Sequence, residues 1–176
     1  MCRLTMLGRA DTESISMRRR RNGFSLIELL IVVAIILIIA AIAIPNLLRS
    51  RMQANEASAA ASIHGINTAE VSYSSTFPTV GFAPSLIALG DGGTPPCAGT
   101  SAAGCYLDQN LQNGTKSGYV FTYVPDASTT PSLQYSLNAD PITRGITGQR
   151  SFFSSAANVT RWNPTIPATS ADQPLQ

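Results

Sequence analysis

The sequence predicts an α+β protein in which one long N-terminal helix packs on a small antiparallel sheet. Three features of the 176-residue chain support this class. An unbroken apolar run lies near the N-terminus, helix-forming residues continue beyond it, and strand-like runs follow a stretch rich in Gly, Pro, Ser and Thr. We expect four segments: a basic leader over 1–23, an apolar helix half over 24–45, an amphipathic half over 46–77, and a domain with the sheet over 78–176.

Charged residues are few and unevenly distributed. They make up 12% of the chain, with a formal net charge of +2. Residues 1–23 carry six Arg against Asp11 and Glu13, whereas residues 24–176 carry six basic and eight acidic residues. The basic character therefore belongs to the N-terminal tail, and nothing after it indicates a nucleic-acid partner.

The apolar run over 24–44 reads FSLIELLIVVAIILIIAAIAI, and only Ser25 and Glu28 in it are polar. A helix of this length spans about 31 Å, close to the hydrocarbon thickness of a bilayer. Because it is apolar on every side, we expect it to cross a membrane. Four arginines precede it: Arg18, Arg19, Arg20 and Arg21. This asymmetry predicts a cytoplasmic N-terminus.

Two simple interpretations of this helix compete with a more specific one. It could be a plain signal anchor, or a secretory signal cut after Ala43, which would release an exported binding protein. Neither accounts for Gly23 directly after the basic run or for Glu28 within the helix. A carboxylate in a membrane helix usually has a function.

Residues 18–51, RRRRNGFSLIELLIVVAIILIIAAIAIPNLLRSR, resemble the N-terminal signature of type IV prepilins and of the pseudopilins of type II secretion. The resemblance implies that a prepilin peptidase cuts after Gly23 and methylates the new amino terminus at Phe24. Glu28 and Pro45 also match this signature. Met17, directly before the basic run, is a candidate for the true start of the leader.

The resemblance implies a structural role rather than catalysis. The chain would be a subunit of a type IV pilus, with a secretion pseudopilin as the alternative. Its partners would be the peptidase and methyltransferase, identical or related pilin subunits, an inner-membrane assembly platform and the lipid bilayer. It would lie in the inner membrane before joining an extracellular pilus or a periplasmic pseudopilus. With one histidine, His64, and no nucleophile or phosphate motif, the chain gives no reason to expect an enzyme or a cofactor.

Glu28 has a physical role in such an assembly. Cleavage creates an ammonium at Phe24, and helical residues 24 and 28 share one face. In a core of packed apolar helices an unpaired carboxylate is costly, so Glu28 is expected to pair with the Phe24 ammonium of a neighbouring subunit and to fix the register. The alternative is a carboxylate merely tolerated near the membrane interface.

The helix is expected to bend at Pro45, which removes a backbone hydrogen bond, and to continue to about Phe77. Leu37 stands where many pilins carry glycine. In the second half, a stripe at helical spacing could lie against the domain with the sheet. Its members are Met52, Glu56, Ala59, Ile63, Ile66, Glu70 and Tyr73.

The region after residue 78 predicts an antiparallel sheet connected by turns. Helical turns are expected at Ser85–Leu89 and Leu107–Leu111, and strands at Gly118–Pro125, Leu133–Asn138 and Ser151–Trp162. Alternating aromatic and β-branched residues mark the first strand. Turn residues at Asp140-Pro141 and Gly145–Gly148 separate the later ones.

The cysteines predict one disulfide. Cys2 falls in the leader, whereas Cys97 and Cys105 form a pair in an exported loop, where oxidation is favoured. Two thiols without further ligands cannot complete a zinc site, so no metal is expected. Four turn aspartates are interpreted as solvated carboxylates: Asp91, Asp108, Asp126 and Asp140.

Overall fold

The computed structural model describes residues 23–93 and 96–175. The predicted leader features at Cys2, Met17 and Arg18–Arg21 lie outside the described residues. The described chain divides after Ala41 into two compact units, and each is described by itself.

Helix α1 runs without interruption over Leu26–Thr76 and includes Pro45. The expected start at Phe24 is wrong by two residues, because the backbone carbonyl of Ser25 accepts the first helical hydrogen bond, from Leu29 N at 3.2 Å. Serine is a favoured residue at a helix N-cap. The end at Thr76 agrees with the predicted one within a residue, since Pro78 disfavours helical geometry at Phe77. A bend at Pro45 stays a prediction.

Two short helices follow α1 in the sequence and precede the first strand. α2 covers Leu86–Leu89, where the Ser85 side chain accepts from Ala88 N, which confirms the predicted turn. α3 covers Gln109–Gln112, slightly after its predicted place, because the Asp108 side chain caps it by accepting from Leu111 N. A carboxylate at this position stabilises a helix start.

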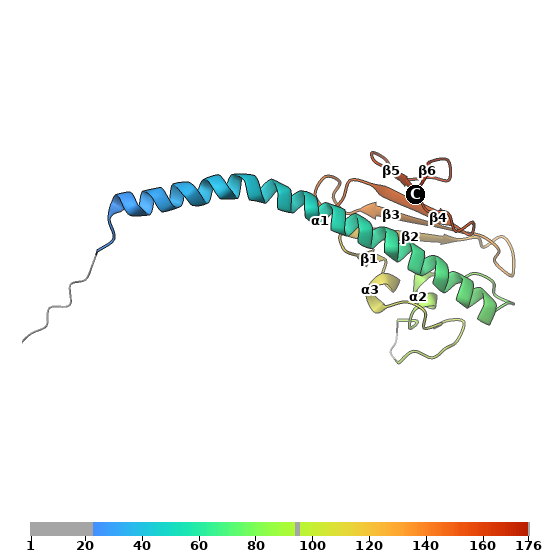
Figure 1. Ribbon diagram of the computed structural model, residues 1–176. Coiled ribbons are helices and arrows are strands. Elements are labelled where there is room, and N and C mark those ends of the chain that lie inside the picture. Colours follow the sequence, from blue (N-terminus) through green and yellow to red (C-terminus); the bar gives the residue numbers. More distant parts are fainter. Residues whose placement is uncertain (1–22, 94–95, 176) are drawn as a thin grey trace, which may run out of the picture. The chain divides into compact units, whose positions relative to one another are not determined.

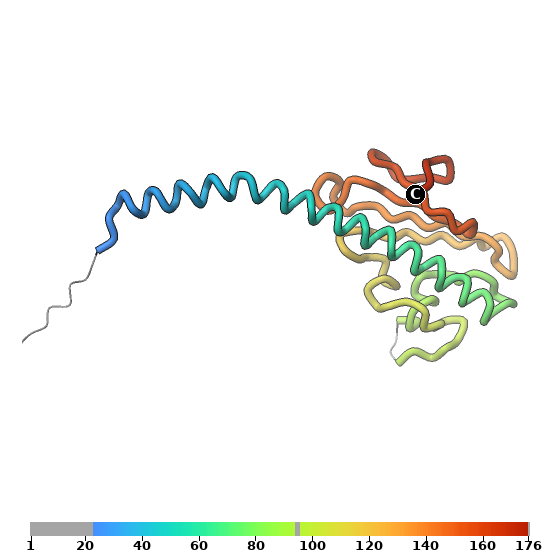
Figure 2. The backbone as a smooth tube through the Cα atoms, in the orientation of Figure 1, coloured from blue at the N-terminus to red at the C-terminus, as the bar shows by residue number. Residues whose placement is uncertain are grey.

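The sheet has six antiparallel strands in the order β1-β2-β3-β4-β5-β6, so each strand pairs with the next one along the chain (Figures 1 and 2). The strands are β1 Thr115–Lys116, β2 Tyr119–Pro125, β3 Tyr135–Pro141, β4 Ser151–Ser155, β5 Arg161–Asn163 and β6 Gln173–Pro174. The predicted α+β class and its antiparallel sheet are therefore confirmed.

Three details of the predicted sheet are wrong. The second strand runs over Tyr135–Pro141, so Asp140 and Pro141 belong to it and pair with β2 rather than forming a turn. The predicted run Ser151–Trp162 is two strands, β4 and β5, joined by a turn in which Asn158 has a φ of 57°. The short edge strands β1 and β6 carry too few residues for a period-two pattern to reveal them.

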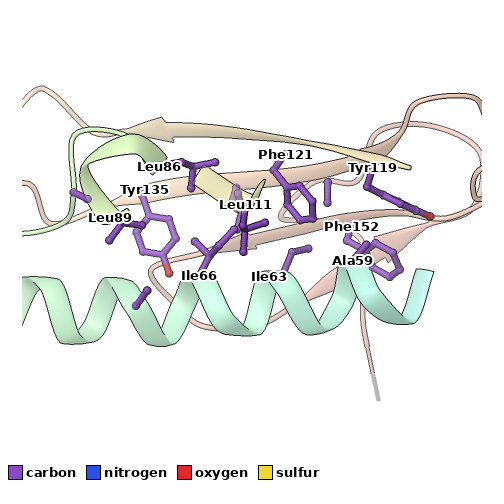
Figure 3. Packing of buried hydrophobic residues seen from close by; sticks show 14 of the residues in the cluster. Ala59, Ile63, Ile66, Leu86, Leu89, Leu111, Tyr119, Phe121, Tyr135 and Phe152 are labelled. Atoms are coloured by element: carbon purple, nitrogen blue, oxygen red, sulfur yellow. The ribbon is translucent and has the colours of Figure 1, made fainter. Parts of the chain in front are cut away.

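The core lies between the second half of α1 and one face of the sheet. Ile63 and Ile66 point from α1 toward the aromatic and aliphatic side chains opposite, among them Phe121 and Phe152 (Figure 3). Alternate strand residues face α1, so Leu137 is buried while its neighbour Asn138 is partly exposed. The stripe predicted on α1 is buried from Glu56 to Tyr73, as expected for the face that contacts the sheet.

Candidate functional site

The expected cleavage site lies at the start of the described chain. Gly23 and Phe24 precede α1 and are not helical. Phe24 is 78% exposed, and no described atom beyond the two neighbouring residues lies within 4 Å of the position that a Cβ on Gly23 would take. The bond between these two residues is therefore unobstructed by the described part of the chain.

Glu28 lies in the first turn of α1 with an exposed side chain. A carboxylate in this turn interacts favourably with the helix dipole. Because α1 begins at Leu26, Phe24 does not share the helix with Glu28 here, contrary to the geometry expected from sequence. The carboxylate has no described partner within its own chain among residues 23–93 and 96–175, which leaves it available to another molecule.

The first half of α1 presents an apolar surface that no described part of its own chain covers. Every Phe, Leu, Ile and Val between residues 24 and 48 is at least 46% exposed. Among the described helices, α1 is the one long and apolar enough to cross a membrane. A contiguous apolar surface of this size marks contact with lipid or with other protein chains.

In the second half of α1, Glu56 is buried against the start of β4. Its Oε1 accepts from Gln149 N at 2.8 Å and Arg150 N at 3.1 Å, and its Oε2 accepts from Arg150 Nε at 2.7 Å. Burial raises the pKa of Glu56, but the hydrogen bonds from Gln149 and Arg150 outweigh it and hold the pKa below its ordinary value. Glu56 is therefore ionised at neutral pH.

Glu70 is the second buried carboxyl group on α1. It is fully buried, its Oε2 accepts from Ala83 N at 3.0 Å, and its Oε1 has no described partner. Tyr123 donates its hydroxyl to the carbonyl of the same Ala83. Burial raises the pKa of Glu70 to about 7.

The predicted stripe placed both glutamates on the correct face of α1 but could not identify their partners. The partners of Glu56 are Gln149 and Arg150, which are far from it in sequence, and the partner of Glu70 is Ala83, which lies in a loop. No local sequence pattern links these partners to the glutamates. A carboxylate within an otherwise apolar stripe is nevertheless a usable signal, because burial requires it to find donors.

Cys97 and Cys105 form a disulfide, as predicted. It closes the loop that follows α2, and the hydroxyl of Tyr73 on α1 donates to the Ser101 carbonyl in this loop at 2.5 Å. His64 lies exposed on α1. The described residues contain no group of three His, Cys, Asp or Glu side chains placed to hold a metal ion.

Comparisons with known proteins concern mainly the N-terminal segment. Residues 18–44 match the family model of the prokaryotic N-terminal methylation motif. The chain is 43% identical over 72 residues to the type IV major pilin protein PilA of Myxococcus xanthus, which covers 37% of this chain and 33% of that protein. It is 63% identical over 38 residues to the type IV wide pilus major component PilA4 of Thermus thermophilus, covering 22% of this chain and 29% of that protein.

These matches have a limited extent. The chain spans about a third of the length of the curated relatives it matches. No solved structure matches it. The methylation motif and the two matches therefore show a similarity to type IV pilins in the N-terminal part of the chain, and the α+β fold with its long apolar helix is consistent with that similarity.

Proposed function

We propose that this chain is a structural subunit of a type IV pilus. The prepilin is inserted in the inner membrane with its N-terminus in the cytoplasm, cleaved after Gly23 and methylated at Phe24. It then polymerises through the apolar helix over residues 24–45. The chain has three kinds of protein partner in these steps: the prepilin peptidase and methyltransferase, an inner-membrane assembly platform, and other pilin subunits.

One observation supports this proposal most strongly: within residues 23–93 and 96–175, nothing covers the apolar surface of residues 24–48. Burial of apolar surface stabilises by roughly 25 cal/mol per Å². A bilayer covers this surface before assembly, and neighbouring helices cover it in a filament. The sheet domain and its core are complete without it, so the helix is free to make contacts between subunits.

The charges near the N-terminus determine how the helices align. After cleavage, the Phe24 ammonium and the Glu28 carboxylate are the two charged groups in the segment that enters the filament core. A dry core penalises either group when it is alone. Pairing Glu28 of one subunit with the Phe24 ammonium of the next satisfies both and selects one axial register.

Replacing Glu28 tests this proposal. Glu28→Ala removes the partner of a buried ammonium, which typically costs about 3 to 5 kcal/mol for each added subunit. The variant is expected to insert and to be cleaved, but to be missing from filaments sheared from the cell surface. Immunoblots of the sheared and membrane fractions measure both outcomes in one strain.

Glu56→Gln serves as the matched control, because it removes a carboxylate from the second half of the same helix and leaves residues 24–45 unchanged. It is expected to yield filaments. Wild-type amounts of filament from Glu28→Ala cells would contradict the register argument, and absence of this chain from filaments of wild-type cells would contradict the proposed function.

A further inference from the structure

The point at which α1 first meets the sheet unit is polar rather than apolar. Glu56 is the first buried residue of α1, and Asn55 beside it donates from Nδ2 to the Thr147 carbonyl at 2.8 Å. The residues from 46 to 54 are exposed or partly exposed, and the apolar core begins only at Ala59. The first contacts of α1 with the sheet unit are thus directional hydrogen bonds.

These hydrogen bonds gather on one short segment between β3 and β4. Oε1 of Glu56 accepts from two consecutive backbone N–H groups, those of Gln149 and Arg150. Both lie just before β4, outside the paired residues of the sheet, so they have no strand partner. Both hydrogen bonds are partly buried, and an N–H group shielded from water is costly without an acceptor, which gives Glu56 a specific role.

Arg150 is held from two sides. Its Nε donates to Oε2 of Glu56 at 2.7 Å, and its guanidinium carbon lies 5.8 Å from the ring centroid of Phe152 and 5.4 Å from that of Trp162. Phe152 and Trp162 pair across β4 and β5. The contact therefore fixes α1 to two strands through one side chain.

We propose that Glu56 is a positioning residue that fixes the boundary between the free and the packed part of α1, by accepting the N–H groups of Gln149 and Arg150. Without this acceptor, the described hydrogen bonds of α1 before Ala59 are reduced to those of Asn55 with Thr147 and of Ser58 with Ser117, so this part of the helix detaches more readily and the boundary shifts toward Ala59, where apolar packing begins. Glu56 thereby determines where the free part of α1 ends, and with it how much of the helix can contact a membrane or neighbouring subunits. This last consequence rests on the proposed function, whereas the boundary itself does not.

Hydrogen–deuterium exchange of the full-length protein in detergent micelles tests the boundary. In Glu56→Ala, amides of residues 55–58 are expected to exchange about tenfold faster. In the wild type, local opening of this segment must break the hydrogen bonds of Glu56, whereas in the variant these bonds are absent and opening is more frequent. Amides of residues 46–51 already lie outside the packed part, and those of residues 63–73 lie in the core. Both groups are expected to keep their wild-type rates.

A second variant separates the acceptor role from charge. Glu56→Gln keeps a side-chain oxygen for the two N–H groups and loses the ion pair, so we expect its rates to stay closer to wild type than to Glu56→Ala. Asp126→Ala removes a carboxylate that accepts from Ser128 N at 2.9 Å in an exposed hydrogen bond just after β2, and serves as the control with no change at residues 55–58.

Three results would overturn the proposal. One is wild-type exchange at residues 55–58 in Glu56→Ala. Another is equal acceleration at residues 55–58 and 63–73, which indicates general destabilisation. The third is a Glu56→Gln variant as fast as Glu56→Ala. All three are read without filaments, so a failure of the proposed pilus function leaves the test of Glu56 intact.

Discussion

At the scale of single residues, the two ends of α1 use carboxylates in opposite ways. Glu28 is exposed and has no described partner within residues 23–93 and 96–175, whereas Glu56 and Glu70 are buried and bind backbone N–H groups. The first is suited to a partner outside the chain, and the other two determine how the chain itself packs. The pKa values of Glu56 and Glu70 differ because hydrogen bonds outweigh burial at Glu56 but not at Glu70.

Glu70 predicts a measurable pH dependence of stability. Burial raises its pKa from the ordinary 4.5 to about 7, so the folded state binds this proton more tightly than the unfolded state. The resulting stabilisation is complete below about pH 4.5 and is lost as the pH rises through about 7, with a magnitude on the order of 3 kcal/mol.

Chemical denaturation at pH 5 and pH 8 checks this, with Glu70→Gln as the comparison. The Gln side chain keeps an oxygen for Ala83 N but does not titrate. The unfolding free energy of the wild type, taken relative to that of this variant, should therefore be lower at pH 8 than at pH 5. An unchanged difference at the two pH values would refute the assignment.

Replacing Gly23 by a larger residue is expected to prevent processing. We expect Gly23→Val to accumulate as full-length precursor in the inner membrane, because the peptidase must approach the backbone on both sides of the bond it cuts. Immunoblotting for precursor and mature sizes measures this. Mature protein at wild-type levels would contradict the proposed cleavage after Gly23.

At the scale of elements, the sequence predicts regular segments well and irregular ones poorly. The helical stripe located the buried face of α1, and aromatic alternation located β2, because both patterns repeat over several residues. The break between β4 and β5 was missed since Asn158 adopts a left-handed turn within a run that lacks Gly and Pro. The extension of β3 through Pro141 was also missed. Pro141 belongs to the strand because it pairs with Tyr119 of β2, and such a pairing cannot be seen in the local sequence.

The site shows the same division. A contiguous signature that needs no tertiary structure is enough to predict roles for Gly23, Phe24 and Glu28, and these roles stay predictions. The roles of Arg150 and Ala83 could not be predicted in this way, because they arise only when α1 and the sheet unit come together. Long-range partners of buried carboxylates therefore require a structure.

α1 predicts a clear contrast between a residue in its packed part and one before it. Ile63 is fully buried in the core, so Ile63→Ala should lower the unfolding free energy of the sheet unit by about 3 kcal/mol. Leu47→Ala, at a residue 54% exposed, should leave it unchanged. Denaturant titration in detergent measures both, and equal losses would contradict the described packing.

The disulfide predicts a moderate effect. Joint replacement of Cys97 and Cys105 by Ser opens a loop with a sequence separation of 8 residues. On the chain-entropy model this costs about 2.5 kcal/mol. Thermal unfolding of the two forms without reductant gives the difference, and an unchanged midpoint would show that the loop is held by its other contacts, such as that from Tyr73.

At the scale of the whole molecule, the chain combines a complete core with an uncovered apolar helix. Residues 42–176 form a compact unit by themselves, and the apolar residues before them have no partner among the described residues. An apolar surface of this size marks contact with a membrane or with other protein chains.

The central claim is that the chain is processed as a pilin before it assembles. Mass spectrometry of the N-terminal peptide from the mature protein tests it most directly, because each interpretation of the apolar segment gives a different terminus. We predict a chain that begins with N-methylated Phe24. A mature chain that begins at Ile44, after cleavage behind Ala43, would contradict the claim and identify the protein as one released without its apolar helix.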